Sequence, residues 1–269
     1  MSLEQQINLT DYPIEHLESP RAKALVERCR IRLKEQGAYV LAGFLREKAL
    51  GTIIGELNGV LDKAFYKSKS HNVFLAPDDE HFPRSHPRNR PQVTTSATLA
   101  YDFVAGDSLL ESIYRWQPLR EFIARTLDLG ELHPYADDLA AVNVLVYPPG
   151  SMTGWHFDNA NFVVTLMLHQ AQSGGAYEYA PFIRDPEADN YSAIESVLDE
   201  ASAAVHTLEQ CSGDLVVFQG RYTLHRVTAV GGAEARLVAV LSYDAEPGKM
   251  LSPHTQMTFY GRSTLADRL

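Results

Sequence analysis

Hydrophobic positions in the first half of the chain repeat with the period of an α-helix. The first such stretch follows Ser19, which suits an N-cap, and Pro20, which suits the first helical position, and it ends at Gly37. Two more stretches with a period near 3.6 residues run over residues 50–65 and 108–129, the latter broken by a proline. The pattern therefore predicts a helical N-terminal part.

From residue 141 onward the pattern changes to short apolar runs separated by Gly, Pro and Asp, which is typical of strands. One helical insertion is predicted at residues 191–200, and one early strand at residues 38–41. The runs are too closely spaced for alternating strand–helix units, so we expect an antiparallel jelly roll, a cupin-like double-stranded β-helix with the N-terminal helices packed on one sheet. The predicted strands cover residues 141–147, 152–158, 162–169, 176–180, 204–208, 214–219, 223–230 and 235–243.

The chain of 269 residues is expected to form a single domain. In this organisation the helical part covers about residues 1–135, the jelly-roll core about 138–245, and a closing segment 246–269. Residues 71–98, rich in His, Pro, Asp and Arg, show little periodicity. An unpatterned segment of that length is more often functional than neutral, although disorder is the alternative.

Composition narrows the range of partners and compartments. The formal net charge of −10 argues against a nucleic-acid binder, because phosphate neutralisation needs a surface rich in Lys and Arg. The two cysteines, Cys29 and Cys211, fit reduced thiols. Without an export signal or a long apolar segment, the sequence predicts a cytoplasmic protein that does not bind membranes. The sequence does not decide the oligomeric state, and a homodimer is possible.

Two polar residues alternate within one of the predicted strands. In G-W-H-F-D, His156 and Asp158 point to one side, and Trp155 and Phe157 to the other. An ionised aspartate facing a barrel interior is costly unless it is paired, and a bound cation is the simplest partner. On these two residues alone, a hydrogen-bonded core histidine and an aspartate at the strand end, near the surface, are the favoured explanation.

A second histidine, His225, lies in a later β-like run. Two imidazoles and one carboxylate from two strands form the facial triad that suits non-haem Fe(II), and three protein ligands leave positions open for a co-substrate and O2. Zinc would accept the same residues, so ligand identity alone does not decide the metal.

On the next predicted strand, Arg236 interrupts an apolar run. Such an arginine is costly unless it meets an anion, and a bound dicarboxylate would match its fork geometry. An internal salt bridge is the alternative. Arg226, adjacent to His225, should point to the opposite face.

These motifs resemble those of the Fe(II)/2-oxoglutarate-dependent oxygenases. The stretches G-G-A-Y-E-Y-A-P-F-I-R (174–184), D-N-Y (189–191), G-D-L-V-V-F-Q-G-R-Y-T-L-H-R-V-T-A-V (213–230) and M-T-F-Y-G-R (257–262), with S-H-N-V-F-L near residue 70, narrow the resemblance. They are similar to the group that contains the radical amino-acid halogenases of the BesD/HalD type and their hydroxylating relatives. The resemblance runs from about Ser19 to the C-terminus. It implies iron, 2-oxoglutarate and O2 as cofactors and co-substrate, and a free amino acid or close derivative as substrate.

Two departures from the family pattern carry chemical meaning. The halogenases have a small residue where this chain has Asp158, which frees an iron position for chloride, so the resemblance favours hydroxylation here. Many oxygenases of the wider superfamily place Ser or Thr two residues after the arginine, where this chain has Val238. Another hydroxyl must then assist Arg236 in holding 2-oxoglutarate, and we expect Tyr147 or Thr165.

Substrate contacts are expected from two charged regions. Arginines of the long loop would bind a carboxylate, with a histidine and residues 252–260 closing the pocket. Aspartates before the first core strand would bind an ammonium. Taken singly, each of these residues fits ordinary surface charge better than substrate binding. The residues concerned are Arg84, His86, Arg88, Arg90, Asp137 and Asp138.

The sequence therefore predicts a dioxygenase that hydroxylates an unactivated C–H bond of a free amino acid, lysine-like or other, with succinate and CO2 as co-products. Desaturation or oxidative cyclisation of an amino-acid derivative in natural-product biosynthesis is an alternative outcome of the same chemistry. An alternative of another class is a cupin-type metal-binding isomerase or binding module. Arg236 distinguishes these classes, because only the oxygenase needs an anchor for 2-oxoglutarate.

Overall fold

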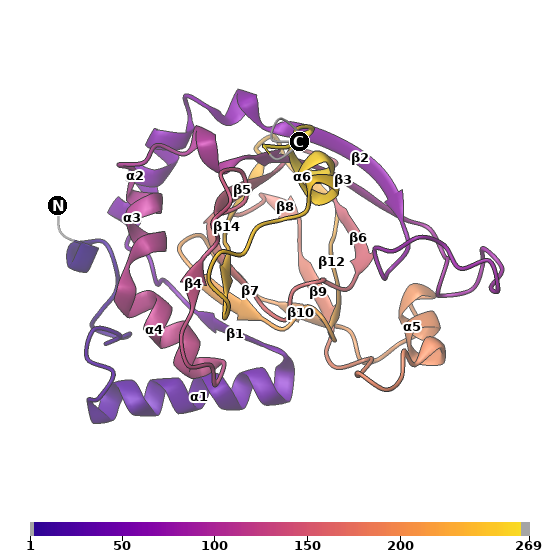
Figure 1. Cartoon of the computed structure of the whole chain (residues 1–269), viewed down its shortest axis with the longest axis horizontal. Coiled ribbons are helices and arrows are strands. Elements are labelled where there is room, and N and C mark those ends of the chain that lie inside the picture. The colour runs from indigo at the N-terminus through magenta and orange to yellow at the C-terminus, as the bar shows by residue number, and fades with distance from the viewer. Residues whose placement is uncertain (1–2, 265–269) are drawn as a thin grey trace.

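Two antiparallel sheets enclose the interior of the protein (Figure 1). The computed structural model describes residues 3–264. The larger sheet has seven strands in the order β1-β11-β7-β14-β5-β3-β2, and the smaller has the order β10-β9-β12-β6. This arrangement confirms the predicted double-stranded β-helix. The strands of the larger sheet are β1 (Ala38–Leu41), β11 (Leu215–Phe218), β7 (Val163–His169), β14 (Arg236–Leu241), β5 (Val142–Tyr147), β3 (Gln92–Leu99) and β2 (Phe65–His71); those of the smaller are β10 (His206–Leu208), β9 (Tyr177–Ala180), β12 (Leu224–Val227) and β6 (Thr153–His156).

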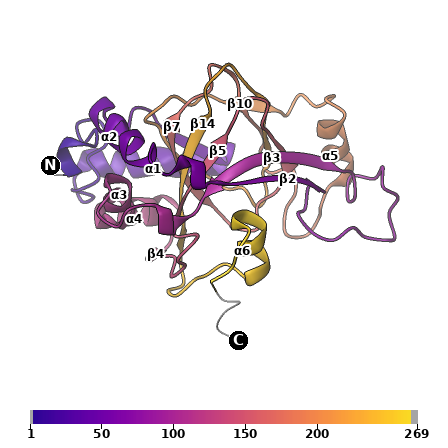
Figure 2. The same ribbon diagram turned by 90° about the horizontal axis from the view of Figure 1, so that it is seen from above.

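Four helices cover the outer face of the larger sheet: α1 (Pro20–Gln36), α2 (Glu47–Leu57), α3 (Leu109–Arg115) and α4 (Gln117–Thr126). Figure 2 shows them gathered at one end of the molecule. The first begins as predicted, because the Ser19 hydroxyl accepts a hydrogen bond from the amide of Ala22. It ends at Gly37, which adopts the left-handed conformation that glycine tolerates.

Side chains alternate between the two faces of the larger sheet. Leu99, Val144, Leu166 and Ala239 belong to the core packed against the helices, while residues of the opposite parity line the inner face. The inner face carries Arg236 and Tyr147, which are direct partners between β14 and β5. The sheets thus place polar side chains inside the barrel and the main apolar core outside it.

Two sequence predictions, one near residue 65 and one near residue 92, are wrong in detail. The second helix ends at Leu57, a short 3-10 turn follows at Leu61–Lys63, and Phe65 begins β2. Residues 92–98, expected in the long loop, belong to β3, which leaves residues 72–91 as the loop. The strand β2 reads F-Y-K-S-K-S-H and lacks the apolar alternation that marks a strand. It forms the edge of its sheet, where charged and polar side chains are common.

Helices α5 (Tyr191–Leu198) and α6 (Pro253–Tyr260) lie at two other places on the barrel. Helix α5 packs on the outer face of the smaller sheet, where Ile194 joins Trp155, Phe157 and Val73 in a separate apolar cluster. Helix α6 packs against β2 and β3, next to the open end of the barrel (Figures 1 and 2). Helix α5 thus covers the smaller sheet, and helix α6 covers β2 and β3 of the larger one.

The remaining elements are short. The strands β4 (His133–Pro134) and β15 (Tyr243–Asp244) pair with each other, as do β8 (Ser173–Gly174) and β13 (Val230–Gly231). Two further 3-10 turns lie at Leu3–Gln5 and Tyr101–Phe103. Among residues 3–264, no helix combines the length and the apolar character needed to cross a membrane.

Candidate active site

His156, Asp158 and His225 lie together inside the barrel. The histidines are direct partners between β6 and β12, and their ring centroids are 4.1 Å apart. Asp158 follows β6, and its Oδ1 and Oδ2 lie 3.6 Å from Nε2 of His156 and of His225 respectively. One ligand atom from each residue lies within 4.8 Å of the others. The three groups are therefore close enough to share one metal ion.

Backbone hydrogen bonds set the tautomer of both imidazoles. Nδ1 of His156 lies 2.9 Å from the carbonyl oxygen of Gly154, and Nδ1 of His225 lies 2.9 Å from that of Thr223. Because a carbonyl only accepts, each Nδ1 carries the proton and each Nε2 presents its lone pair toward Asp158. This is the tautomer that metal-binding histidines use when their other nitrogen donates to the backbone.

Burial favours the neutral form of His225 and leaves Asp158 short of partners. Desolvation lowers the pKa of His225 to about 4, so its imidazole is unprotonated at neutral pH. Burial raises the pKa of Asp158, but His225 and then His156 lower it, and the net direction is downward. Its Oδ2 is buried and has no hydrogen-bond partner within residues 3–264. A cation between these groups would satisfy that oxygen.

Arg236 is a buried cation on the inner face of the larger sheet. Its side chain has no acidic partner within residues 3–264, and Nη2 makes one long hydrogen bond of 3.3 Å to Oε1 of Gln210. The guanidinium carbon lies 5.4 Å from the ring centroid of Tyr147. Burial lowers the pKa of this arginine. The predicted internal salt bridge, the alternative to an anion site, is not present in this part of the chain.

Tyr177, which is not among the site residues predicted from the sequence, lies near both the histidine–aspartate group and Arg236. Its ring stacks on His225 at 5.5 Å between centroids, and its hydroxyl is buried without a partner within residues 3–264. Burial and then the charge of Asp158 raise its pKa well above the usual value, while Arg236 acts in the opposite direction. A free hydroxyl beside both groups suits a ligand that spans them.

The two hydroxyls expected near Arg236 both lie on the inner face. Tyr147 is the cross-strand partner of Arg236, and its hydroxyl hydrogen-bonds Oγ1 of Thr153 at 3.0 Å. Thr165 lies two strands away from Tyr147, paired with Val240 and Val216. Of the hydroxyls considered, only that of Tyr177 is both buried and unpaired in the described part of the chain.

The sequence model of the family described as Halogenase D matches residues 21–259, most of the chain. The chain belongs to the halogenase D family. This confirms the resemblance read from the motifs, and with the histidine–aspartate group it makes iron and 2-oxoglutarate the cofactors of this enzyme. The protein is thus an Fe/2-oxoglutarate oxygenase acting on a small molecule, rather than a cupin-type isomerase.

Solved structures of other proteins share the fold of this family member. The non-haem α-ketoglutarate-dependent carbocyclase SnoK from nogalamycin biosynthesis is 16% identical, with a TM-score of 0.57 over 81% of this chain and 83% of its own. The epimerase SnoN from the same biosynthesis is 14% identical, with a TM-score of 0.56 over 86% and 91%. AviO1 from Streptomyces viridochromogenes Tue57 is 16% identical, with a TM-score of 0.55 over 84% and 97%. No curated protein sequence matches the chain.

The loop residues expected to bind substrate have partners on the outer side of this oxygenase. Arg88 donates to the carbonyl of Pro77 and lies over the ring of Phe74, and Arg90 pairs with Asp199 after α5. The ring of His86 stacks on Phe82 and meets Tyr191 of α5 edge-on, and Arg84 is exposed. These contacts anchor residues 72–91 to α5, and they leave one buried donor, Nη1 of Arg88, unpaired in the described residues.

Asp137 holds the C-terminal segment in place. Its carboxylate accepts hydrogen bonds from the amides of Leu139, Ala140 and Leu251 and from the side chain of Gln256 in α6. Because protein donors use both oxygens, the contacts favour a structural role over binding of a substrate ammonium. Asp138 is exposed.

The outer face of the smaller sheet is filled by packing. Arg226 pairs with Glu178 at 2.6 Å, and its guanidinium carbon lies 4.7 Å from the ring centroid of Trp155. Trp155 and Arg226 therefore face away from the histidines, as strand alternation predicts.

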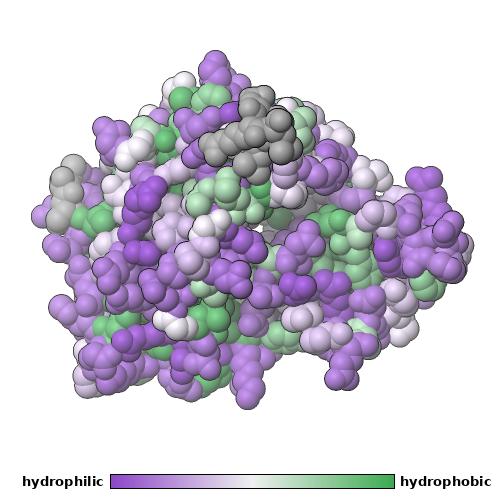
Figure 3. Space-filling model, viewed as in Figure 1, coloured by the Kyte–Doolittle hydropathy of each residue, from purple (hydrophilic) through white to green (hydrophobic). Residues whose placement is uncertain are grey.

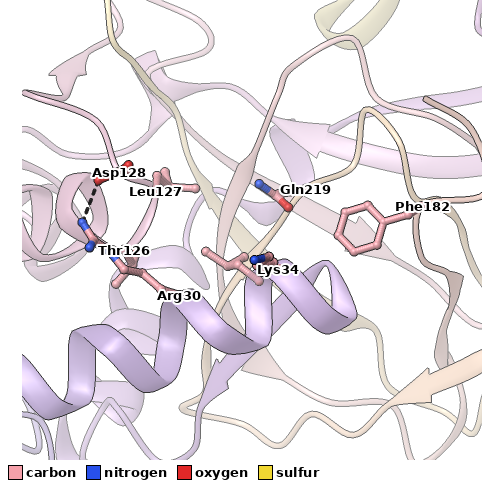
Figure 4. Close-up of a pocket in the computed structure, with 8 residues that line it drawn as sticks. Arg30, Lys34, Thr126, Leu127, Asp128, Phe182 and Gln219 are labelled. Carbon is pink, nitrogen blue, oxygen red and sulfur yellow. Dashed lines mark hydrogen bonds and ion pairs between the residues drawn. The ribbon is translucent and has the colours of Figure 1, made fainter. Parts of the chain in front are cut away.

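The surface has a hollow at the barrel opening and a separate depression elsewhere. Figure 3 shows a hollow near the centre of the view, beside α6 at the open end of the barrel. A separate depression of about 410 Å³ lies between α1 and the end of α4, lined by Arg30, Leu33, Lys34, Thr126, Leu127, Asp128, Phe182 and Gln219 (Figure 4). It is open to solvent and contains none of the histidine–aspartate group, so it is not the reaction site.

Proposed function

We propose that this oxygenase hydroxylates an unactivated C–H bond of a free amino acid or a close derivative. In the overall reaction, substrate, 2-oxoglutarate and O2 give the hydroxylated product, succinate and CO2. The observation that carries the proposal is Asp158, whose two oxygens lie 3.6 Å from the two histidine nitrogens. A carboxylate at this point would take the iron position that chloride needs in a halogenase.

His156, Asp158 and His225 would hold the iron. Two neutral imidazoles and one ionised carboxylate are the donor set of non-haem Fe(II) oxygenases, and one oxygen of Asp158 has no other partner in the described residues. The hydrogen bonds from Nδ1 to Gly154 and Thr223 keep both Nε2 atoms directed inward. The residues present therefore fit this metal.

Arg236 and Tyr177 would hold 2-oxoglutarate. The guanidinium can receive the distal carboxylate through two parallel hydrogen bonds, and the unpaired hydroxyl of Tyr177 can donate to the same ligand. Gly175 makes room for the arginine, since a Cβ atom there would lie 3.2 Å from Cδ of Arg236. Tyr177 would thus supply the hydroxyl that Val238 cannot.

Bound iron and 2-oxoglutarate supply the oxidation of the C–H bond by O2. The protein's own contribution is positional. Strand pairing fixes His225 opposite both His156 and Tyr179, so the reacting region faces the barrel interior and not solvent. The rings of Tyr177 and Phe218, which contact His225, exclude water from one side of it.

The test is anaerobic loading with Fe(II) and 2-oxoglutarate, followed by exposure to O2 with a panel of amino acids. Succinate formation coupled to consumption of one amino acid, with a product heavier by one oxygen atom, is the expected result. A product lighter by two hydrogen atoms would indicate desaturation or ring closure, and a chlorinated product in the presence of chloride would overturn the role given to Asp158.

A further inference from the structure

Lys67 is a buried cation without an acidic partner. Only 9% of its surface is exposed, and among residues 3–264 no carboxylate lies within ion-pair distance of its ammonium. Its Nζ instead lies 3.7 Å from the ring centroid of Phe259 in α6. An unpaired ammonium loses much of its hydration when buried, and a cation–π contact restores only part of that free energy.

The strand register places Lys67 on the inner face of the barrel. Lys67 pairs with Ser96, and Ser96 falls next to Tyr147 because Ala97 pairs with Val146. Tyr147 in turn pairs with Arg236. Lys67 and Arg236 therefore lie in one row across β2, β3, β5 and β14, roughly 14 Å apart between backbones at the usual strand spacing.

Two other polar residues, Thr98 and His71, lie on this face. Thr98, two pairs along from Lys67 and of the same parity as Ser96, has a buried hydroxyl without a hydrogen bond in the described residues. His71, on the same face of β2, meets the ring of His156 edge-on at 6.2 Å. The face that carries Lys67 thus continues to the histidine–aspartate group.

Charge balance also favours an anion beside Lys67. Fe(II) with Asp158 carries one net positive charge, and 2-oxoglutarate with Arg236 carries one net negative charge, so the two sets offset each other. The ammonium of Lys67 then remains uncompensated. Helix α6 covers it, and Asp137 and the pair of Arg262 with Asp102 hold that segment to the barrel.

We propose that Lys67 binds the carboxylate of the amino-acid substrate, between the inner face of β2 and helix α6. This inference rests on the proposed function. It gives the recognition of the carboxylate to a strand residue inside the barrel instead of the loop arginines. The substrate would then lie beside 2-oxoglutarate on the inner face, with its side chain directed toward the histidines.

The test compares the amino acid with the highest turnover with its carboxamide, which lacks the negative charge. Binding of each to the anaerobic Fe(II)–2-oxoglutarate enzyme is measured by calorimetry, for wild type, Lys67→Met, Lys67→Arg and Lys69→Met. Lys69 lies on the same strand and is exposed, so it controls for the loss of a surface charge.

We expect Lys67→Met to weaken binding of the amino acid by about tenfold or more and to leave the carboxamide unchanged. Lys67→Arg should retain part of the preference, and Lys69→Met all of it. Equal losses for both ligands would show that Lys67 only fastens α6, and no loss for either would exclude any role; both results overturn the inference while the wild type still hydroxylates amino acids. A wild type that consumes no amino acid overturns the proposed function, and this inference with it.

Discussion

Gly220 lies directly against the carboxylate of Asp158. A Cβ atom added to Gly220 would lie 1.9 Å from Oδ2 and 2.6 Å from Cγ, and the amide of Asp158 donates to the carbonyl of Gly220 at 3.0 Å. The turn between β11 and β12 therefore shapes the space in which the carboxylate meets the two histidines.

Gly220→Ala should weaken Fe(II) binding because the added methyl group must push the whole Asp158 side chain aside. We expect a loss of affinity of about 10- to 100-fold, comparable to the loss of a group that orients a ligand. Calorimetric titration with Fe(II) under argon measures it. The control is Gly55→Ala at an exposed position of helix α2, where the methyl group meets nothing within 4 Å. Equal Fe(II) affinities in the two variants would contradict the role of Gly220.

Asp158→Gly should abolish hydroxylation while preserving the fold. The change removes one of three proposed iron ligands, so activity should fall by more than the roughly 100-fold that follows loss of an orienting partner. Mass spectrometry of the products, with and without chloride, measures both oxygen and chlorine insertion. Asp158→Asn keeps the shape but loses the charge, and should also be impaired. Full hydroxylation by Asp158→Gly would exclude the carboxylate as a ligand.

Arg236→Met should lose 2-oxoglutarate binding without loss of stability. The variant removes a buried charge that has no acidic partner in the described residues, so the free energy of unfolding of the metal-free protein should stay equal or rise. The increase in melting temperature caused by 2-oxoglutarate with Fe(II) should disappear. Thermal unfolding with and without the co-substrate measures both effects.

Arg226→Met provides the matched control for that experiment. Arg226 pairs with Glu178 on the outer face, so its removal leaves a partly buried carboxylate unpaired and should destabilise the protein. The shift caused by 2-oxoglutarate should remain. If both arginine variants respond alike to 2-oxoglutarate, Arg236 does not hold it.

The helices, most strands and the His156, Asp158 and His225 motif could be predicted because their signals are local. Ser19 and Gly37 mark the ends of α1 by their own backbone preferences, and alternation within one strand places His156 and Asp158 on one face. Arg236 was identifiable because a charge within an apolar run is conspicuous.

The roles of Tyr177 and Lys67 could not be predicted from the sequence. They depend on burial without a hydrogen-bond acceptor or an acidic partner in the described residues, which only the fold shows. A tyrosine in a strand usually packs or finds a hydrogen bond, and only the fold shows that this hydroxyl is buried without one in the described residues. Lys67 lies in the polar edge strand β2, so burial under α6 from the far end of the chain is invisible in the local pattern. Long-range contacts of this kind are not visible in the local sequence pattern.

Asp137→Ala should destabilise the protein through the C-terminal segment. The change leaves the amide of Leu251 and the fully buried side chain of Gln256 without their acceptor, at a cost of about 2–4 kcal/mol in the free energy of unfolding. Urea denaturation measures it. The neighbouring Asp138→Ala removes an exposed carboxylate and should change stability by less than about 0.5 kcal/mol. A loss of stability in Asp137→Ala no larger than that in Asp138→Ala would contradict the structural assignment of Asp137.

Lys67 should give the metal-free protein a stability that rises with pH. Burial, and then the charge of Lys69, lower its pKa from 10.5 to about 7. Between those values the unfolded chain holds a proton that the folded protein has released, so the free energy of unfolding increases as pH rises from 7 to 10.5. The contribution is on the order of 5 kcal/mol over that window.

Urea denaturation of wild type and Lys67→Met at several pH values between 7 and 10 isolates this effect. Because the variant lacks the buried amine, it should exceed the wild type in stability most at pH 7, and the difference should shrink toward pH 10. Lys69→Met controls for the change in net charge. A difference between wild type and Lys67→Met that is constant with pH would mean that the ammonium is as well solvated in the folded protein as in the unfolded chain, and that burial under α6 exerts no desolvation on it.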